Sequence, residues 1–329
     1  MLEARRLHPS RRATLAALAG ALAAPAAFAQ PASHKPIRII VGFGPGSAND
    51  LIARELARYM AESLGQPVIV ENRPGAGGSV GTEVVAKAAP DGLTLGLGTS
   101  SQLVMNVALY RHLPFDVERD LRPIGLIGRT PLVLAGKASG AKTLKELIAT
   151  ARANPGQVTY GSGGTGSISH IVGEAFARAA HVQLNHIPYK GNGPAMADLA
   201  GGHVNLVFDG IITAKPMAQQ GRVRLLAFGG KQRSPVIADV PTFAEQGLRD
   251  YDAYSWNCLF APAKTPEVEI TRLNQALNAA LALPAMKDRL ARGGSDNLGP
   301  SSPAQADAFG RAERARWVPF VRSLKLDVG

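Results

Sequence analysis

The chain has 329 residues and a formal net charge of +11, to which the first 29 residues contribute four arginines and one glutamate. Beyond these residues lysine and arginine form no runs, and aromatic residues make up only 5% of the chain, so no stacking platform for nucleic acid is evident and we expect no nucleic-acid partner. The single cysteine, Cys258, cannot form an internal disulfide, and we expect neither a metal nor a cofactor. The histidines His34, His112, His181, His186 and His203 are dispersed, and each is interpreted as a surface or packing residue.

Residues 1–29 have the features of a secretory signal. A basic head that contains Arg5 and Arg12 precedes an apolar run over 13–24 that is too short to span a bilayer comfortably. Ala27-Phe28-Ala29 is a small-x-small cleavage site before Gln30, and the segment 10–15 also resembles a twin-arginine export signal. No second long apolar segment follows, so we expect a soluble periplasmic protein.

The mature chain begins with a strand, a glycine loop and a helix. The apolar run Ile37 to Val41 predicts a buried strand, the glycines over 42–46 prevent its continuation, and Ser47 or Asn49 can cap the next helix. Backbone N–H groups at such a helix start, with a favourable dipole, make this loop a candidate anion cradle. Two other interpretations stay open here, namely a tight turn that only packs the helix, and a dinucleotide loop whose pattern fails at Ser47.

The next elements repeat this order. We predict a strand over 67–70, a glycine loop over 71–78, a helix over 79–89 and a strand over 93–97 that ends at Gly98. Strands that alternate with helices indicate a mostly parallel sheet, so the loops that begin at Gly42 and Gly98 are expected on the same edge.

A long extended segment over 122–135 is interpreted as a strand that passes from one lobe to another. After it we predict a helix over 142–153 capped by Thr143, a strand over 158–160, and a second glycine loop from Gly161 to His170 that leads into a helix over 171–179. Two such loops, one in each lobe, could face each other across a cleft and bind one anion between them.

The remaining elements complete the second lobe and return to the first. We predict a strand that ends in 186–191, a helix over 194–199, a strand over 204–209 with the terminal acid Asp209, a strand over 224–228, a return crossover over 251–262 and helices from 266, the last over about 303–324. Tyr254 and Trp256 are interpreted as core residues of the crossover that can also line a hinge.

Several segments together resemble the Bug (TctC-like) extracytoplasmic solute receptors of tripartite tricarboxylate transporters. The motifs that carry the resemblance are Val41-Gly42-Phe43-Gly44-Pro45-Gly46-Ser47 with Asp50 and Ala53-Arg54, Val70-Glu71-Asn72-Arg73-Pro74-Gly75-Ala76-Gly77-Gly78, Pro90-Asp91-Gly92, Leu113-Pro114-Phe115-Asp116, His186-Ile187-Pro188-Tyr189-Lys190-Gly191, Arg233-Ser234 and Asp239-Val240-Pro241-Thr242. They run in order from about Ile37 to Pro266. The resemblance implies a type II periplasmic-binding-protein fold, with two α/β lobes joined by two crossover strands. We place lobe 1 at 30–128 and 254–329, and lobe 2 at 129–253.

The resemblance also implies a monomeric, non-catalytic receptor that binds a small carboxylate, partly through waters, and delivers it to membrane permease subunits. We call Phe43 to Asp50 the first cradle and Ser162 to His170 the second cradle. The expected ligand-binding residues are Phe43, Gly44, Gly46, Ser47, Asp50, Thr99, Ser100, Ser162, Gly163, Gly164, Thr165, Gly166, Ser167, His170 and Asp209. The chain departs from the family at Ser47, where a second glycine is usual, and at Thr99-Ser100-Ser101, which leaves the ligand's identity open.

Alternatives remain for several of these residues. A secreted serine hydrolase could use Ser162 or Ser167 with His170 and Asp209, although the G-x-S-x-G elbow is absent. His170 could instead stabilise its own loop. Asp50 could cap its helix, bind an ammonium group or bridge to a ligand through water, and Asp209 could cap its strand end or accept a ligand donor.

Overall fold

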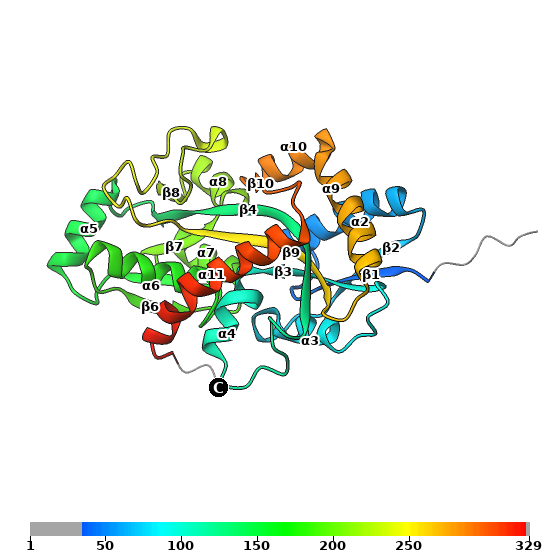
Figure 1. The fold of residues 1–329 in the computed structure, drawn as a ribbon. Helices are drawn as coiled ribbons and strands as arrows, with labels where there is room; N and C mark the ends of the chain where they lie inside the picture. Colours follow the sequence, from blue (N-terminus) through cyan, green and yellow to red (C-terminus); the bar gives the residue numbers. More distant parts are fainter. Residues whose placement is uncertain (1–34, 327–329) are drawn as a thin grey trace, which may run out of the picture. The chain divides into compact units, whose positions relative to one another are not determined.

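The computed structural model describes residues 35–326, so the predicted signal at 1–29 lies outside the described part. Residues 36–326 form one compact unit (Figure 1). Its strands are β1 Ile37–Val41, β2 Val68–Asn72, β3 Thr94–Thr99, β4 Leu121–Lys137, β5 Thr159–Ser162, β6 Asn185–Pro188, β7 Leu206–Gly210, β8 Val223–Phe228, β9 Tyr254–Pro262 and β10 Asp296–Asn297.

The longer helices are α2 Ala48–Leu64, α3 Ser79–Ala86, α5 Leu144–Ala153, α6 Ile168–Ala180, α7 Asn192–Gly201, α8 Ile211–Gln219, α9 Glu267–Ala282, α10 Pro284–Arg292 and α11 Pro303–Ser323. The short ones are the 3₁₀ turns η1 Ala76–Gly78 and η3 Pro235–Ile237, the π-helix η2 Ser101–Met105, and α4 Asn106–Leu109.

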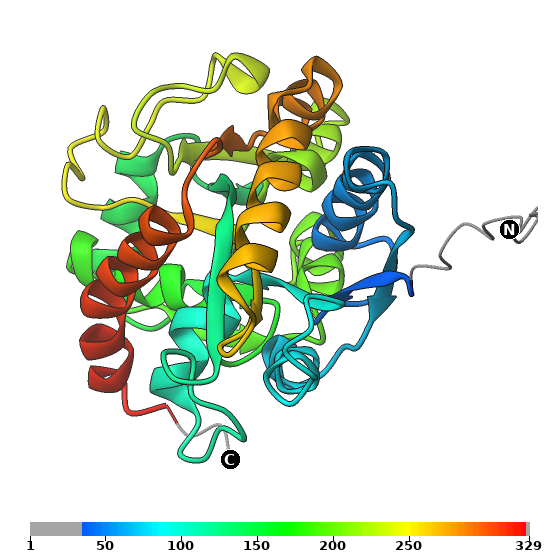
Figure 2. The ribbon, with the colours of Figure 1, turned by 45° about the vertical axis from the view of Figure 1, so that its right-hand side comes forward.

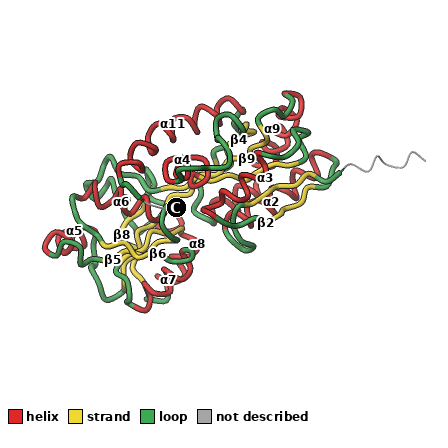
Figure 3. The backbone as a smooth tube through the Cα atoms, turned by 90° about the horizontal axis from the view of Figure 1, so that it is seen from below, coloured by secondary structure: helices red, strands yellow, loops and turns green. Residues whose placement is uncertain are grey.

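Two groups of parallel strands are joined through β4 and β9. One group has the order β2-β1-β3 and the other the order β7-β5-β6, and within each group the strands are parallel. β9 pairs with β3 and β4, and β4 also pairs with β7 and β8. All of these pairings are antiparallel. Figure 3 shows β4 and β9 running between the two groups. The predicted extended segments over 122–135 and 251–262 are thus strands that connect the two halves.

Helices cover both faces of each group of strands. On the first group, α2, α9 and α10 bury one face, and α3, η2, α4 and α11 bury the other. On the second group, α5 and α6 cover one face, and α7 and α8 cover the other. Figure 2 shows α9 beside α2, and α11 packs against the connecting strand β4. The predicted layered α/β architecture follows from this burial.

Most predicted elements are present within a few residues, and the differences have local causes. The helix predicted from 171 begins at Ile168, because Ser167 caps it, so the last part of the predicted loop is its first turn. α8 and the η2–α4 segment were not predicted. The side chains of η2 are all buried, so its sequence carries no amphipathic period, and α8 contains Pro216 and has no side-chain cap.

Candidate ligand-binding site

The first cradle is closed by a hydrogen-bond network at the start of α2. Ser47, at N-cap, accepts the N–H of Asp50 through its hydroxyl at 3.2 Å, and its own N–H bonds to the Gly44 carbonyl at 3.3 Å. Gly46 has a φ of +79°, which glycine adopts without strain, and its N–H donates to the Asp50 carboxylate at 2.9 Å. Of the two predicted caps, Ser47 is the one used.

The second cradle repeats this geometry at the start of α6. Ser167 accepts the N–H of His170 at 3.3 Å, and its own N–H bonds to the Gly164 carbonyl at 3.1 Å. Gly166 also has a φ of +79°, and its N–H donates to Nδ1 of His170 at 3.0 Å. The two cap residues have nearly the same backbone angles, with φ −65° and ψ 158° in the first cradle and φ −64° and ψ 158° in the second.

The two cradles are therefore one motif used twice, G-x-G-S-x-x-acceptor. In each, the cap hydroxyl satisfies one N–H of the first helical turn, and the N–H groups of the first two helical residues have no intrahelical acceptor. These are Ala48 and Asn49 in α2, and Ile168 and Ser169 in α6. Free N–H groups at the positive end of a helix dipole favour an anion, so each cradle is suited to a carboxylate oxygen.

Asp50 is occupied by donors of the protein itself. Besides Gly46, its carboxylate accepts from Nε of Arg54 at 3.0 Å and from Nδ2 of Asn72 at 2.9 Å, and Asn72 also donates to the Phe43 carbonyl. Burial alone would raise the pKa of Asp50, but these hydrogen bonds together lower it, so the carboxylate is ionised at neutral pH. Asp50 thus holds the loop in shape.

His170 and His186 form a stacked pair behind the second cradle. Their ring centroids are 3.8 Å apart, and Nε2 of His186 is 2.6 Å from the Ser162 hydroxyl. Burial lowers the pKa of His170 to about 3, with a further contribution from His186, and burial lowers the pKa of His186 to about 4, so both rings are neutral at neutral pH. His186, interpreted from the sequence as a surface or packing residue, packs against His170 because β6 brings it beside α6.

The hydrolase alternative requires contacts that the structure does not contain. Ser162 bonds to His186 and not to His170, and Ser167 contacts the backbone N–H of His170 rather than its ring. Asp209 bonds to Nδ2 of Asn192 at 2.8 Å, and no hydrogen bond joins it to His170 among the described residues. The predicted Ser–His–Asp arrangement is therefore not assembled.

Among residues 35–326, Asp209 and Thr99 each place a buried oxygen that has no hydrogen-bond partner near a cradle. Asp209 is 7% exposed, its Oδ2 is unpartnered, and burial raises its pKa. Its other oxygen connects through Asn192 to the Ser169 hydroxyl, which accepts the N–H of Gly163. Thr99 is 3% exposed, its Oγ1 is unpartnered, and it ends β3, which lies beside the strand that leads into the first cradle.

The other predicted residues at these edges are also placed. Ser100 follows Thr99 and its hydroxyl lies 3.1 Å from that of Ser255 on β9. The parallel register of β1 and β3 confirms that the loops after these strands share one edge. Thr165 is exposed at the outer part of the second cradle.

Each cradle also lies against an element outside its own group of strands. Asn49 accepts from Nδ2 of Asn257 on β9 at 2.8 Å, and an added Cβ on Gly166 would lie 2.6 Å from Cδ1 of Leu109 in α4. The first part of β4 pairs with β9, and its last part pairs with β7, where Val133 lies opposite Asp209. Asn72, Asn192, His186 and Leu109 were missed as site residues, although Asn72 and His186 lie in motifs that carry the family resemblance.

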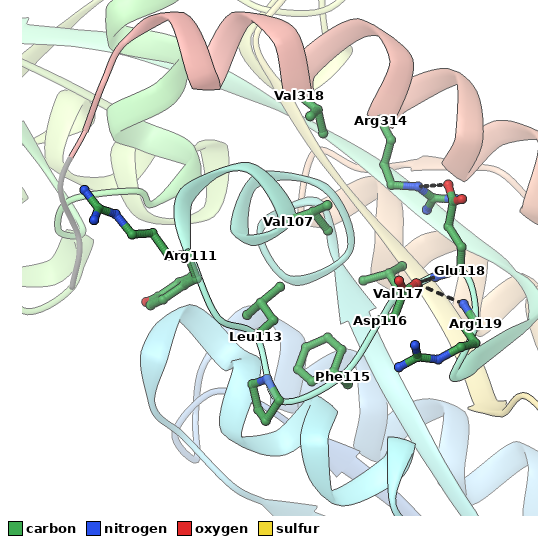
Figure 4. Close-up of a pocket in the computed structure, with 12 residues that line it drawn as sticks. Val107, Arg111, Leu113, Phe115, Asp116, Val117, Glu118, Arg119, Arg314 and Val318 are labelled. Atoms are coloured by element: carbon green, nitrogen blue, oxygen red, sulfur yellow. Dashed lines mark hydrogen bonds and ion pairs between the residues drawn. The ribbon is translucent and has the colours of Figure 1, made fainter.

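A groove of about 700 Å³ lies elsewhere on the molecule, between the segment that follows α4 and the helix α11 (Figure 4). Leu113 and Phe115 contribute apolar surface, and the ion pair between Glu118 and Arg314 closes one side. None of the predicted ligand-binding residues lines it. Size alone does not make a carboxylate site, and the free helical N–H groups are in the cradles, so we place the candidate site there.

Two further observations concern only residues 35–326. Within this range no group of three or more His, Cys, Asp and Glu side chains could hold a metal ion. No helix in the same range has the length and apolar character needed to cross a membrane.

Comparison with known proteins finds relatives that match most of the chain. A family model described as "Tripartite tricarboxylate transporter family receptor" matches residues 52–326. The chain is similar to protein BugT of Bordetella pertussis (strain Tohama I), with 38% identity over 315 residues that cover 94% of this chain and 96% of that protein. It is also similar to a protein of Pseudomonas sp. (strain P51), described as the UPF0065 protein in the tcbD-tcbE intergenic region, with 36% identity over 322 residues that cover 96% of this chain and 95% of that one.

Solved structures match over most of their length. The periplasmic binding protein BugD has a TM-score of 0.79 at 30% identity, covering 89% of this chain and 98% of that chain. An R. palustris protein solved with adipate has a TM-score of 0.81 at 32% identity, covering 89% and 98%. MatC from Rhodopseudomonas palustris, solved with bound malate, has a TM-score of 0.78 at 32% identity, covering 87% and 98%. The predicted periplasmic-binding-protein fold with two α/β lobes is confirmed.

Proposed function

Because this chain belongs to the receptor family of tripartite tricarboxylate transporters, whose similar structures are periplasmic binding proteins, we propose that it captures a small organic carboxylate between its two lobes and delivers it to membrane permease subunits. The proposed lobes are 30–128 with 254–329, and 129–253. We propose that the receptor acts as a monomer.

The observation that carries this proposal is the repetition of one anion-binding motif in the two halves of the molecule. The first cradle follows β1, the second follows β5, and each presents unused N–H groups at a helix start. Two relatives of the same fold were solved with dicarboxylates, adipate and malate, whose charged groups suit such donors. A ligand that contacts both cradles would favour the closed arrangement of the lobes, because only that arrangement provides both sets of donors.

The proposed contacts divide the predicted residues into two roles. Backbone N–H groups and hydroxyls of the cradles, with Thr99, Ser100 and Asp209 at neighbouring strand ends, face the ligand. Asp50 and His170 act as positioning residues, because each accepts the N–H of a cradle glycine. The full ligand-facing set comprises Phe43, Gly44, Gly46, Ser47, Thr99, Ser100, Gly163, Gly164, Thr165, Gly166, Ser167 and Asp209, whereas the buried Ser162 is a third positioning residue.

We propose binding without chemical conversion. The one serine within hydrogen-bond distance of a histidine ring among the described residues, Ser162, is completely buried, and its hydroxyl also accepts the N–H of Gly164. A nucleophile must reach its substrate, so this serine is better suited to holding the loop than to attacking a carbonyl.

We further propose that the signal at 1–29 directs export, by either the general secretory or the twin-arginine pathway, and is cleaved after Ala29. Intact-mass measurement of the protein from the periplasmic fraction should show a chain that begins at Gln30. A chain that retains Arg11 and Arg12 after export would contradict cleavage at this site.

The function is tested by thermal-shift screening of the exported protein against organic acids that include malate and adipate, followed by calorimetric titration of each acid that stabilises it. We expect at least one acid to raise the unfolding temperature, and the acid recovered afterwards to be unchanged by mass spectrometry. Failure of every acid to shift the protein, or recovery of a converted product, would refute the receptor. Labelling of a serine by a fluorophosphonate would favour the hydrolase instead.

A further inference from the structure

One face of three neighbouring strands changes from apolar to polar beside the first cradle. On β9, Leu259 belongs to the apolar cluster under α2 and α9, whereas Trp256 and Cys258 belong to the cluster on the opposite face. Because side chains alternate along a strand, Ser255 and Asn257 point to the same face as Leu259. The polar side chains therefore continue the surface on which α2 begins.

The register of the neighbouring strands extends this polar surface on both sides. Thr99 of β3 lies opposite Asn257, and Thr130 of β4 lies opposite Ser255. Residues directly opposite each other share a face, with Cβ atoms about 4.5 to 5.5 Å apart. We call these four residues, together with Ser100, the polar strip. Ser100 belongs to it because its hydroxyl contacts that of Ser255.

The hydroxyls of the strip have unused hydrogen-bonding capacity. The pair Ser100–Ser255 is 3.1 Å apart, and the hydroxyl of Thr130 is 2.6 Å from that of Ser295. A hydroxyl offers one donor and two acceptor positions, so each pair uses one donor and leaves the other O–H free. Thr130 and Ser255 are partly exposed, which makes these groups accessible to a small molecule.

Two further members of the strip show the same incomplete pairing. Thr99 is 3% exposed, and no partner is present for its Oγ1 among the described residues. Asn257 uses its amide NH₂ on Asn49 of the first cradle at 2.8 Å, which ties the strip to the anion-binding loop. A buried polar atom without a partner is costly, so the unpaired hydroxyl of Thr99 points to a ligand that supplies one.

The strip is also electrically neutral. Its five members carry no charge, and the neighbouring Arg129 lies opposite Trp256, so its side chain belongs to the other face. Arg129 pairs there with Asp296 and lies 5.2 Å from the Tyr254 ring centroid. A second carboxylate placed on the strip would find no cation among its members, whereas a neutral hydroxyl would find both donors and acceptors.

From this arrangement we infer that the ligand is a hydroxycarboxylic acid, whose carboxylate is bound by the cradles and whose hydroxyl is bound by the polar strip. This inference rests on the proposed function, and it names Thr130 and Ser255, with Thr99, as specificity-determining residues. An acid without the hydroxyl would leave the strip unpaired, and a site built around a substrate hydroxyl rejects the analogue that lacks it.

The test compares acids that differ only in hydroxylation. Calorimetric titration of the exported protein uses lactate against propionate, malate against succinate, tartrate against succinate, citrate against tricarballylate and gluconate against hexanoate. We expect the hydroxylated member of each pair that binds to bind at least about tenfold more tightly. If the deoxy member of every binding pair binds as well or better, the hydroxyl inference is wrong and the carboxylate receptor stands. If no acid binds, the proposed function itself fails.

Variants identify the residues responsible. Ser255→Ala and Thr130→Val each remove one hydroxyl at similar volume, and both should reduce the preference for the hydroxylated acid by about tenfold while leaving the deoxy acid's affinity within about threefold. Thr94→Val is the matched control, since Thr94 lies at the other end of β3 and bonds to Arg38. It should leave the ratio unchanged. Unfolding midpoints measured without ligand check that each variant is folded. If Ser255→Ala lowers the affinity for the hydroxylated and the deoxy acid equally, the strip has a structural role only.

Discussion

Substituting alanine for the two equivalent cradle glycines tests how the second cradle is packed. Gly46 and Gly166 share a φ of +79°, where a side chain costs about 1 to 2 kcal/mol. An added Cβ at Gly46 meets no atom within 4 Å, whereas one at Gly166 would lie 2.6 Å from Cδ1 of Leu109. Leu109 is 6% exposed, so it has little room to move, and such overpacking costs about a further 1 to 3 kcal/mol.

We therefore expect Gly46→Ala to lower the free energy of unfolding by about 1 to 2 kcal/mol and Gly166→Ala by about 2 to 5 kcal/mol. Urea denaturation followed by tryptophan fluorescence measures both, with the slope checked for two-state behaviour. In the background of Leu109→Ala the extra cost of Gly166→Ala should disappear, because the clashing methyl group is gone. Equal costs for the two glycines in the wild-type background would show that the second cradle does not pack on α4.

Three further predictions concern the core and its titrating groups. Glu313→Ala should lower the free energy of unfolding by about 3 kcal/mol, because it removes the acceptor of the buried donors Tyr254 and Trp256. Arg311→Ala on the same helix removes only an exposed ion pair and should cost under about 0.5 kcal/mol. Equal losses for the two variants in urea denaturation would contradict this. Because burial lowers the pKa of His170 to about 3, the unfolded state binds a proton that the folded state does not between that value and about 6.5, so stability should fall as the pH drops below about 6.5. By pH 5 the share of His170 is about 2 kcal/mol, and His186, whose pKa is lowered to about 4, adds a similar loss, so His170→Asn should remove about half of the total in denaturation curves at the two pH values. Burial raises the pKa of the Cys258 thiol to about 12, so Ellman's reagent should react with it only after unfolding; rapid labelling of the folded protein would refute its burial.

The strand–loop–helix units could be predicted because their signals are local. Glycines end β1 and β5, and serines three residues ahead of an acceptor begin α2 and α6, all within about ten residues of sequence. The same rules fail for η2 and α4, where every residue of η2 is buried and the sequence shows no polar face. They fail for α8 as well, because its N-cap is Gly210, which supplies no side-chain bond.

Only those parts of the candidate site that lie within one segment of the chain could be predicted from the sequence. The cradles follow from glycine and serine spacing, but the polar strip joins Thr99, Thr130 and Ser255 from three strands whose register is fixed by tertiary pairing. The pair of His170 and His186 depends likewise on β6 lying beside β5. Sequence patterns within one segment contain no information on such neighbours, so the residue types of a Ser–His–Asp triad occur in the sequence although the fold does not assemble them.

The two cradles also show that equal geometry does not imply equal electrostatics. At the last motif position Asp50 and His170 accept a glycine N–H at nearly the same distance, 2.9 and 3.0 Å, so either group satisfies the backbone. Four residues further, Arg54 pairs with the ionised Asp50, whereas Glu174 lies 3.9 Å from a histidine that burial keeps neutral. The motif therefore specifies loop shape through hydrogen bonding alone, and the charge behind each cradle is set by what the next helical turn and the neighbouring strand place against that acceptor.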